Sequence, residues 1–368
     1  MWGGSLLGAV AVLGAGVVGY LQLPKFGAIA DQAVLSQSSH YQNGAFQNLE
    51  PMPVSTLAEG EERKGWTDML FSDGNRVPDH ALPFEKTDLH SLDPTQDLVV
   101  WLGHSSFFIQ LAGKRLLIDP VLSQNASPVP MTITAFPGTS PYQPEDIPAV
   151  DYLLISHDHW DHLDYPTLTA LKDKIGMAIM GVGVGAHFRR WGFAEEQLRE
   201  QDWDSSVALD NGLKIHVLPA RHFSGRLFDR NQSLWVSYAL ETPSRRIYFS
   251  GDSGYGSHFK RIGDQYGPFD LVMLDSGQYN QQWRYVHMMP EDSVQAADDL
   301  RAKAYMPAHV GRFSLAFHSW ADPFQRVTSA SANHPWQLVT PEMGSVMALD
   351  NPVGASQQWW LTGNQESL

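Results

Sequence analysis

Short apolar runs separated by turn residues begin near Asp97 and continue through most of the chain. The runs LVVWLG (98–103), SFFIQL (106–111) and RLLIDP (115–120) follow one another closely, which predicts consecutive and mostly antiparallel strands. Later apolar runs predict further strands over 150–156, 177–182, 213–220, 234–242, 246–252 and 270–277.

Helical spacing of apolar residues occurs between these runs, at 165–175, 185–191, 258–266 and 290–300. Strands and helices are therefore mixed throughout the chain. This pattern predicts a single α/β domain with two packed mixed sheets and helices on the outside.

The residue composition at the two ends of the chain differs from that of the middle. Residues 25–95 are rich in Pro, Gly, Asn and Gln, so we expect a linker followed by an irregular arm. The main domain is predicted over 96–350, and a C-terminal tail over 351–368.

The N-terminal segment 1–24, MWGGSLLGAVAVLGAGVVGYLQLP, has no charged residue. At ~1.5 Å per residue it is long enough to cross a hydrocarbon layer of ~30 Å, so we expect a single-pass anchor in a bacterial cell membrane. A cleaved signal peptide, with AIA at 28–30 as the cleavage site, would instead leave a periplasmic protein. A buried helix in a cytoplasmic protein is the third interpretation.

The amino-acid composition limits the class of protein, the binding partners and the kinds of metal ligand. The chain is 43% hydrophobic and 18% charged, which is typical of a folded protein. Its formal net charge of −15 argues against nucleic acid as a partner, because a phosphate backbone requires a basic surface. There is no cysteine, so any metal must be bound by histidines and carboxylates, which favours zinc, iron or manganese.

The stretch SHDHWDHLD (156–164) has the form H-x-H-x-D-H directly after an apolar run. Residues two apart in extended chain point the same way, so His157 and His159 can reach one ion. Asp161 and His162 follow as the chain turns into a helix, and they can face a second ion. Imidazole nitrogens and carboxylate oxygens both suit Zn²⁺.

Other polar residues also follow predicted strands or apolar segments. His222 and Asp252 come at or just after two of the strands, and His309 ends the segment AKAYMPAH. Loops at strand ends are where a rigid scaffold presents functional groups. We therefore expect these residues to share one site with the His157 loop.

These motifs resemble the metallo-β-lactamase superfamily. The stretches WLGHSSFFIQLAGKRLLIDPVLS, PARHFSGRLFDRNQSLWVSY, YFSGDSGYG and PAHVGRF narrow the resemblance to the N-acylphosphatidylethanolamine-hydrolysing phospholipase D subgroup and its bacterial relatives. The resemblance covers about residues 101–317. It implies the αβ/βα sandwich fold.

The resemblance also implies a ligand set for two zinc ions. The first ion would be held by His157, His159 and His222, the second by Asp161, His162 and His309, and Asp252 would bridge the two.

Three further residues have expected roles near this site. His104, in LGHSSF, is expected to orient a ligand, with simple core packing as the alternative. His287, in VHMMPEDS, is expected to donate a proton or contact substrate. Arg312 stands where the subgroup is expected to have a small residue. It is expected to bind a phosphate or carboxylate, with a surface ion pair as the alternative.

The expected function is that of a dinuclear zinc phosphodiesterase of phospholipase D type, acting on N-acyl phospholipids or related membrane lipids. A hydroxide held between the ions would attack phosphorus, with Asp161 orienting the ligands and balancing charge. The alternatives are a lactonase or other carboxyl-ester hydrolase, an RNase-type phosphodiesterase, and a metal-bearing module without turnover. The acidic charge weighs against the RNase, and the full ligand set weighs against the inert module.

Overall fold

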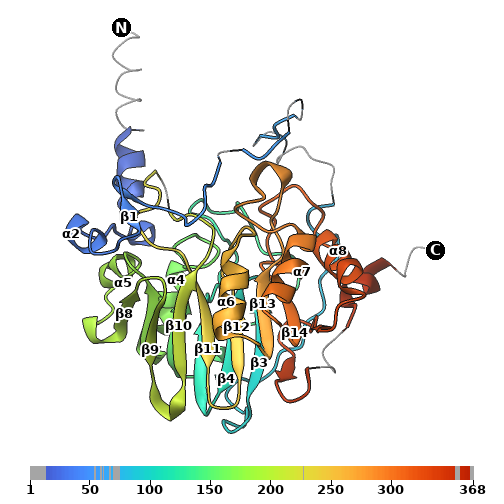
Figure 1. Ribbon diagram of the computed structural model, residues 1–368. Coiled ribbons are helices and arrows are strands. Elements are labelled where there is room, and N and C mark those ends of the chain that lie inside the picture. The colour runs from blue at the N-terminus through green and yellow to red at the C-terminus, as the bar shows by residue number, and fades with distance from the viewer. Residues whose placement is uncertain are drawn as a thin grey trace.

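The computed structural model describes residues 14–53, 55–58, 60, 62–65, 68, 75–226, 228–352 and 357–364. Within these residues two seven-stranded mixed sheets pack face to face, and helices cover the outer face of each sheet (Figure 1). The structure thus confirms the predicted αβ/βα sandwich.

The first sheet has the strand order β16-β3-β4-β5-β6-β7-β8. Pairing is antiparallel from β16 to β5 and parallel from β5 to β8. Its strands are β3 (Leu98–Gly103), β4 (Ser106–Leu111), β5 (Lys114–Ile118), β6 (Val150–Ile155), β7 (Ile175–Gly181), β8 (Leu198–Gln201) and β16 (Val346–Ala348).

The second sheet has the order β15-β14-β13-β12-β11-β10-β9. It is antiparallel from β9 to β12 and parallel from β12 to β15. Its strands are β9 (Ser205–Ala208), β10 (Lys214–Pro219), β11 (Val236–Glu241), β12 (Arg246–Phe249), β13 (Leu271–Asp275), β14 (Ala304–Ala308) and β15 (Gln337–Leu338).

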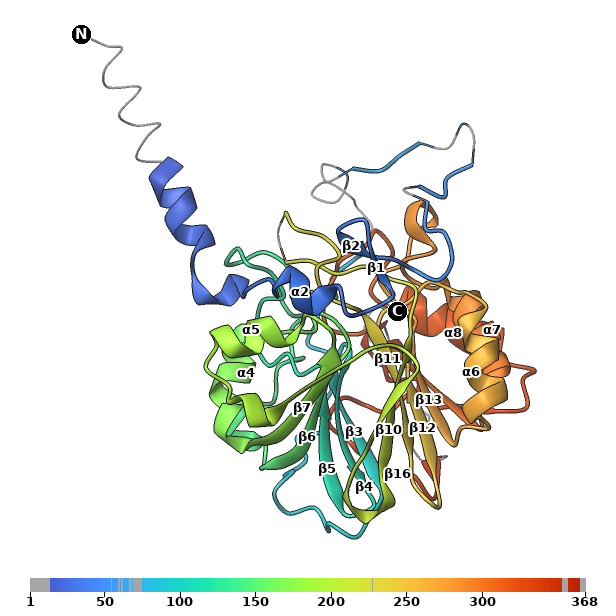
Figure 2. The same ribbon diagram turned by 60° about the vertical axis from the view of Figure 1, so that its left-hand side comes forward.

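Helices flank the two sheets on opposite sides (Figure 2). The first sheet is covered by α4 (Tyr165–Leu171) and α5 (Gly185–Arg190), and the second by α6 (His258–Tyr266), α7 (Pro290–Asp299) and α8 (Asp322–Ser331). Short 3-10 helices are η1 (Pro24–Phe26), η2 (Pro144–Asp146), η3 (Lys172–Lys174), η4 (Glu195–Gln197), η5 (Asp210–Gly212), η6 (Gln281–Trp283) and η8 (Trp359–Asn364).

The core explains why the strands read as continuous apolar runs. In β3, Val99 and Trp101 pack between the sheets, while Leu98 and Val100 pack in the layer under the first sheet's helices. A strand buried on both faces has no polar side, and each fully buried large apolar side chain contributes about 1.5–3 kcal/mol. Burial on both faces therefore stabilises the strands from whose ends the loops project.

The N-terminal segment corrects one expectation. Residues 14–21 are helical, and Val17 and Val18 on this helix are 57% and 61% exposed. Among the described residues no helix is both long and apolar enough to span a bilayer, so the predicted single-pass membrane anchor is wrong. Residues 1–13 of that predicted segment lie outside the described residues. The helix ends before η1, where Tyr20 and Lys25 both donate hydrogen bonds to the Pro128 carbonyl.

Short elements occupy the predicted arm and tail. η1 lies at the start of the predicted arm, which also contains α2 (Gln32–Leu35) and the paired strands β1 (Tyr41–Gln42) and β2 (Ala45–Phe46). In the C-terminal stretch, Trp359 and Trp360 are each 4% exposed and pack on Phe324 of α8. Both ends of the chain thus add side chains to the core.

Candidate metal centre

The C-terminal ends of strands from both sheets meet along one edge of the sandwich (Figure 2). His157 follows β6 in the first sheet, whereas His222, Asp252 and His309 follow β10, β12 and β14 in the second. The loop that begins at His157 faces these three residues. Three groups of side chains result, each with ligand atoms within 4.8 Å of one another. The first is His157, His159, His222 and Asp252, and the second is His104, Asp161, His162 and His309. The third is Asp252, Asp275, His287 and His309, and it shares one residue with each of the first two.

The first group contains three imidazoles beside the Asp252 carboxylate. His159 Nδ1 lies 2.8 Å from His157 Nε2 and 3.2 Å from His222 Nε2. His222 is fixed by its Nδ1, which lies 3.0 Å from the Val286 carbonyl. Three ring nitrogens therefore converge on one point, as the alternation in the motif predicts for His157 and His159.

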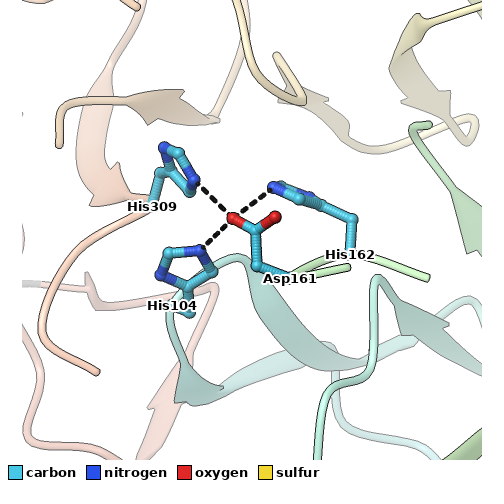
Figure 3. A group of neighbouring side chains, drawn as sticks. All are labelled: His104, Asp161, His162 and His309. Atoms are coloured by element: carbon cyan, nitrogen blue, oxygen red, sulfur yellow. Dashed lines mark hydrogen bonds and ion pairs between the residues drawn. The ribbon is translucent and has the colours of Figure 1, made fainter. Parts of the chain in front are cut away.

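The second group surrounds the Asp161 carboxylate (Figure 3). Asp161 Oδ2 lies 2.9 Å from His104 Nε2, 3.0 Å from His309 Nε2 and 3.5 Å from His162 Nε2. The structure thus brings His104 into direct contact with Asp161. His104 and His309 also share a backbone bridge, because His309 N donates to the His104 carbonyl.

Asp252 lies between the two groups. Its Oδ2 is 3.1 Å from His162 Nε2 and 3.4 Å from His309 Nε2, in the second group. The same oxygen is 3.7 Å from Nε2 of both His157 and His222, in the first group. A single carboxylate therefore reaches both halves of the cluster.

Several buried polar atoms of the cluster have no hydrogen-bond partner within the described residues. These atoms are Asp252 Oδ1, His162 Nε2, His309 Nδ1 and His104 Nδ1. Leaving such an atom unsatisfied costs about 1–3 kcal/mol. Bound cations would satisfy the ligand atoms among them, and a donor set of imidazole nitrogen and carboxylate oxygen fits zinc, iron or manganese.

Burial and neighbouring charges set the protonation states of the metal-free cluster. Burial lowers the pKa of His157 and of His222 well below the usual value, which favours the neutral, ligating imidazole. Burial alone would also lower the pKa of His309, but the carboxylates of Asp252 and Asp275 outweigh it and raise that pKa to about 10. His309 thus keeps its positive charge at neutral pH when no metal is bound.

Two aspartates that the sequence analysis did not single out contact histidines of the cluster. Asp119, at the end of β5, accepts hydrogen bonds from the backbone N–H and hydroxyl of Ser156, and its Oδ2 lies 2.8 Å from His162 Nδ1. Asp275, at the end of β13, lies 2.8 Å from His287 Nδ1. Both aspartates follow apolar runs, which is the signal that could have identified them.

His287 lies at the edge of the cluster. Its ring stacks on His309 at a centroid distance of 4.8 Å and lies 5.1 Å from the His222 ring. Its side chain is 13% exposed, against 1% or less for His222 and His309. His287 therefore combines contact with the cluster and access to solvent.

Arg312 is buried, with only 1% of its surface exposed, so the alternative of a surface ion pair is wrong. Its Nη1 donates to the Leu102 carbonyl, and its Nη2 donates to the Ser123 carbonyl and Ser140 Oγ. These bonds join the turn after His309 to the loop at 123–140. A role for Arg312 in binding substrate stays a prediction.

A family model described as the beta-lactamase superfamily domain matches residues 114–310. An uncharacterised protein of Mycobacterium tuberculosis (strain ATCC 25618 / H37Rv) is 37% identical over 340 residues, which is 90% of each chain. A Caenorhabditis elegans protein named N-acyl-phosphatidylethanolamine-hydrolyzing phospholipase D 1 is 32% identical over 259 residues, covering 65% of this chain and 71% of that protein.

Solved structures share the fold. The metallo hydrolase Igni18 from the archaeon Ignicoccus hospitalis superposes with a TM-score of 0.53 at 22% identity, covering 68% of this chain and 97% of that protein. At this identity the likeness supports the sandwich architecture and nothing finer.

Proposed function

We propose that this chain, which belongs to the metallo-β-lactamase superfamily of metal-dependent hydrolases, is a dinuclear zinc phosphodiesterase of phospholipase D type. The observation that carries the proposal is the position of Asp252 Oδ2 between two groups of histidines. The relative from Caenorhabditis elegans supports an N-acyl phospholipid as the substrate class.

The two groups of side chains suggest how the ions would be shared. The first ion would be held by His157, His159 and His222, the second by Asp161, His162 and His309, and Asp252 would contact both. His104 then has a distinct part, because its Nε2 lies 2.9 Å from Asp161 Oδ2 and fixes that carboxylate.

When bound, the two ions would lower the pKa of a water molecule and stabilise negative charge on the phosphoryl oxygens. The chain supplies the remaining parts. Burial alone would raise the pKa of Asp161. The charge of His162 and the hydrogen bonds that the Asp161 carboxylate accepts outweigh burial, so the pKa of Asp161 lies well below the usual value and the carboxylate stays ionised. His287 Nδ1 donates a hydrogen bond to the Asp275 carboxylate. Nε2 of His287 is therefore the nitrogen that can protonate the departing alcohol oxygen.

Replacing Asp119 with asparagine should lower zinc affinity and activity about 10- to 100-fold, as is typical for residues that orient a metal-bound histidine. The substitution keeps the shape of the side chain but removes the charge beside His162 Nδ1. Zinc affinity is measured by competition with a chromogenic chelator. The matched control is Asp264→Asn on α6, whose carboxylate pairs with Lys260 on the surface. Equal zinc affinity in the two variants would contradict the role given to Asp119.

The substrate is tested by incubating the purified, metal-loaded protein with N-acylphosphatidylethanolamine in mixed micelles. Mass spectrometry should detect phosphatidate together with the free N-acylethanolamine. Phosphatidylethanolamine without the N-acyl group, an acyl lactone and RNA are assayed in parallel. Turnover of the lactone alone would replace the proposal with a lactonase, and metal content measured on the same sample decides between zinc, iron and manganese.

A further inference from the structure

The residues that alternate with the ligands in the motif are Asp158 and Trp160. Both form hydrogen bonds with the loop that follows β10. Asp158 lies between His157 and His159, is 4% exposed, and accepts hydrogen bonds from Gly225 N (2.7 Å) and Ser233 Oγ (2.9 Å). Gly225 has a φ of +138°, and a Cβ there would lie 2.7 Å from the Asp229 carbonyl. The way this loop folds back on its own residues at Asp229 therefore favours glycine at this position.

Arg226, the next residue, reaches both ends of the ligand loop. Its Nη1 donates to the carbonyl of Asp158 at 2.9 Å and to the carbonyl of Leu163 at 2.8 Å. These two carbonyls flank the stretch that holds His159, Asp161 and His162. One guanidinium nitrogen thus fixes the distance between the two ends of that stretch.

The same side chain contacts the loop at a third place. Its guanidinium lies 3.9 Å from the centre of the Trp160 ring, and Trp160 Nε1 donates to the Arg226 carbonyl at 2.9 Å. Nη2 donates to the Lys25 carbonyl at 2.9 Å, which adds the N-terminal segment to the assembly. Arg226 therefore joins three stretches of chain that are remote in sequence.

Burying a cation costs free energy unless its N–H groups are hydrogen-bonded. Arg226 is 6% exposed, and its guanidinium hydrogen bonds go to backbone carbonyls rather than to a carboxylate oxygen. A planar guanidinium can bridge several carbonyls and stack on a ring at once, whereas a lysine ammonium cannot. The loop that Arg226 joins to the ligand loop also carries His222, so the contact links ligands from both sheets.

We propose that Arg226 is a positioning residue, which holds His159, Asp161 and His162 at the spacing needed to bind metal together with His222. The inference rests on the proposed function only in that these histidines and Asp161 are metal ligands. Within the described part of the chain, the hydrogen bonds of the Arg226 guanidinium go to backbone carbonyls and not to ligand side chains, so its effect would pass through the backbone of the loop.

The test compares zinc binding and thermal unfolding of the full chain for wild type, Arg226→Gln and Arg190→Gln. Arg190 is the matched control, because it lines the same cavity and donates to the Gln22 carbonyl of the N-terminal segment without touching the ligand loop. In Arg226→Gln we expect zinc affinity to fall about 10- to 100-fold, the range typical of residues that orient ligands. In Arg190→Gln it should equal that of wild type.

The rise in Tm on adding zinc separates positioning from simple stabilisation. A residue that only supports the fold lowers the Tm of the metal-free and zinc-loaded forms equally, whereas loss of positioning makes the zinc-induced rise smaller. Wild-type zinc affinity in a folded Arg226→Gln variant would overturn the proposal. If that variant does not fold, Arg226→Lys and Trp160→Phe are measured in the same way, and unchanged zinc affinity in those that fold would overturn it equally. Failure of the wild type to bind zinc would instead count against the proposed function.

Discussion

Replacing Asp252 with asparagine is expected to lower kcat/KM by at least about 10³-fold, equivalent to ~4 kcal/mol of activation free energy. The variant should also hold at most one tightly bound ion per chain. Asparagine keeps the size of the side chain, so the change isolates the negative charge.

The expected size of this effect follows from the position of Asp252. Its Oδ2 lies within 3.1–3.7 Å of Nε2 atoms on His162, His309, His157 and His222. No other carboxylate oxygen of the described residues contacts both groups at these distances. Loss of its charge would therefore weaken both ion sites, whereas loss of one histidine would weaken one.

The measurement combines initial rates on the identified substrate with metal content by elemental analysis. Asp264→Asn again provides the control, since Asp264 is exposed and pairs with Lys260 on the same helix. Two ions and wild-type turnover in Asp252→Asn would show that this carboxylate does not bridge the metals.

Removing the metal with a chelator should abolish hydrolysis completely and lower the Tm. At a free metal concentration 1,000-fold above Kd, binding stabilises a protein by about 4 kcal/mol, and this contribution disappears on chelation. Buried atoms of the cluster that have no hydrogen-bond partner within the described residues, among them Asp252 Oδ1 and His162 Nε2, explain why the metal-free form should be the less stable one.

Adding back zinc, iron or manganese separately to the metal-free protein then identifies which ion restores turnover and Tm. Full recovery with zinc supports the proposed cofactor. Retention of hydrolysis after the metal content has fallen to zero would contradict any role for the cluster in catalysis.

Much of the fold could be predicted because the central strands are buried on both faces. The apolar runs at 98–103 and 106–111 coincide with β3 and β4. Strands at the sheet edges were missed: β9, with the sequence SSVA, alternates between half-buried and exposed positions. The edge strand β16 pairs with β3 from far along the chain, which no local pattern reveals.

The site was predictable where its residues form a local motif. The spacing H-x-H-x-D-H alone identifies four residues of the His157 loop as candidate metal ligands. Asp119 and Asp275 do not, because an aspartate after a strand also occurs in ordinary turns. Arg226 lies in an aperiodic loop, and its contacts with Asp158 and Leu163 exist only in the folded structure.

The membrane anchor was predicted from apolar composition, and that criterion was insufficient. A span needs one long continuous helix, and none of the described residues form one that is long and apolar enough. The helical residues 14–21 are followed by the turn that leads into η1. Lys25, just beyond the segment, donates to the Pro128 carbonyl of the main domain.

The division of the cluster between two sheets has a consequence for biosynthesis. The His157 loop belongs to the first sheet, whereas His222, Asp252 and His309 belong to the second. A nascent chain therefore emerges from the ribosome with one half of its ion-binding groups complete while the other half is still to be translated. Under the proposed ligand assignment, the first ion site would be complete once Asp252 has been synthesised, whereas the second would also need His309, which follows β14.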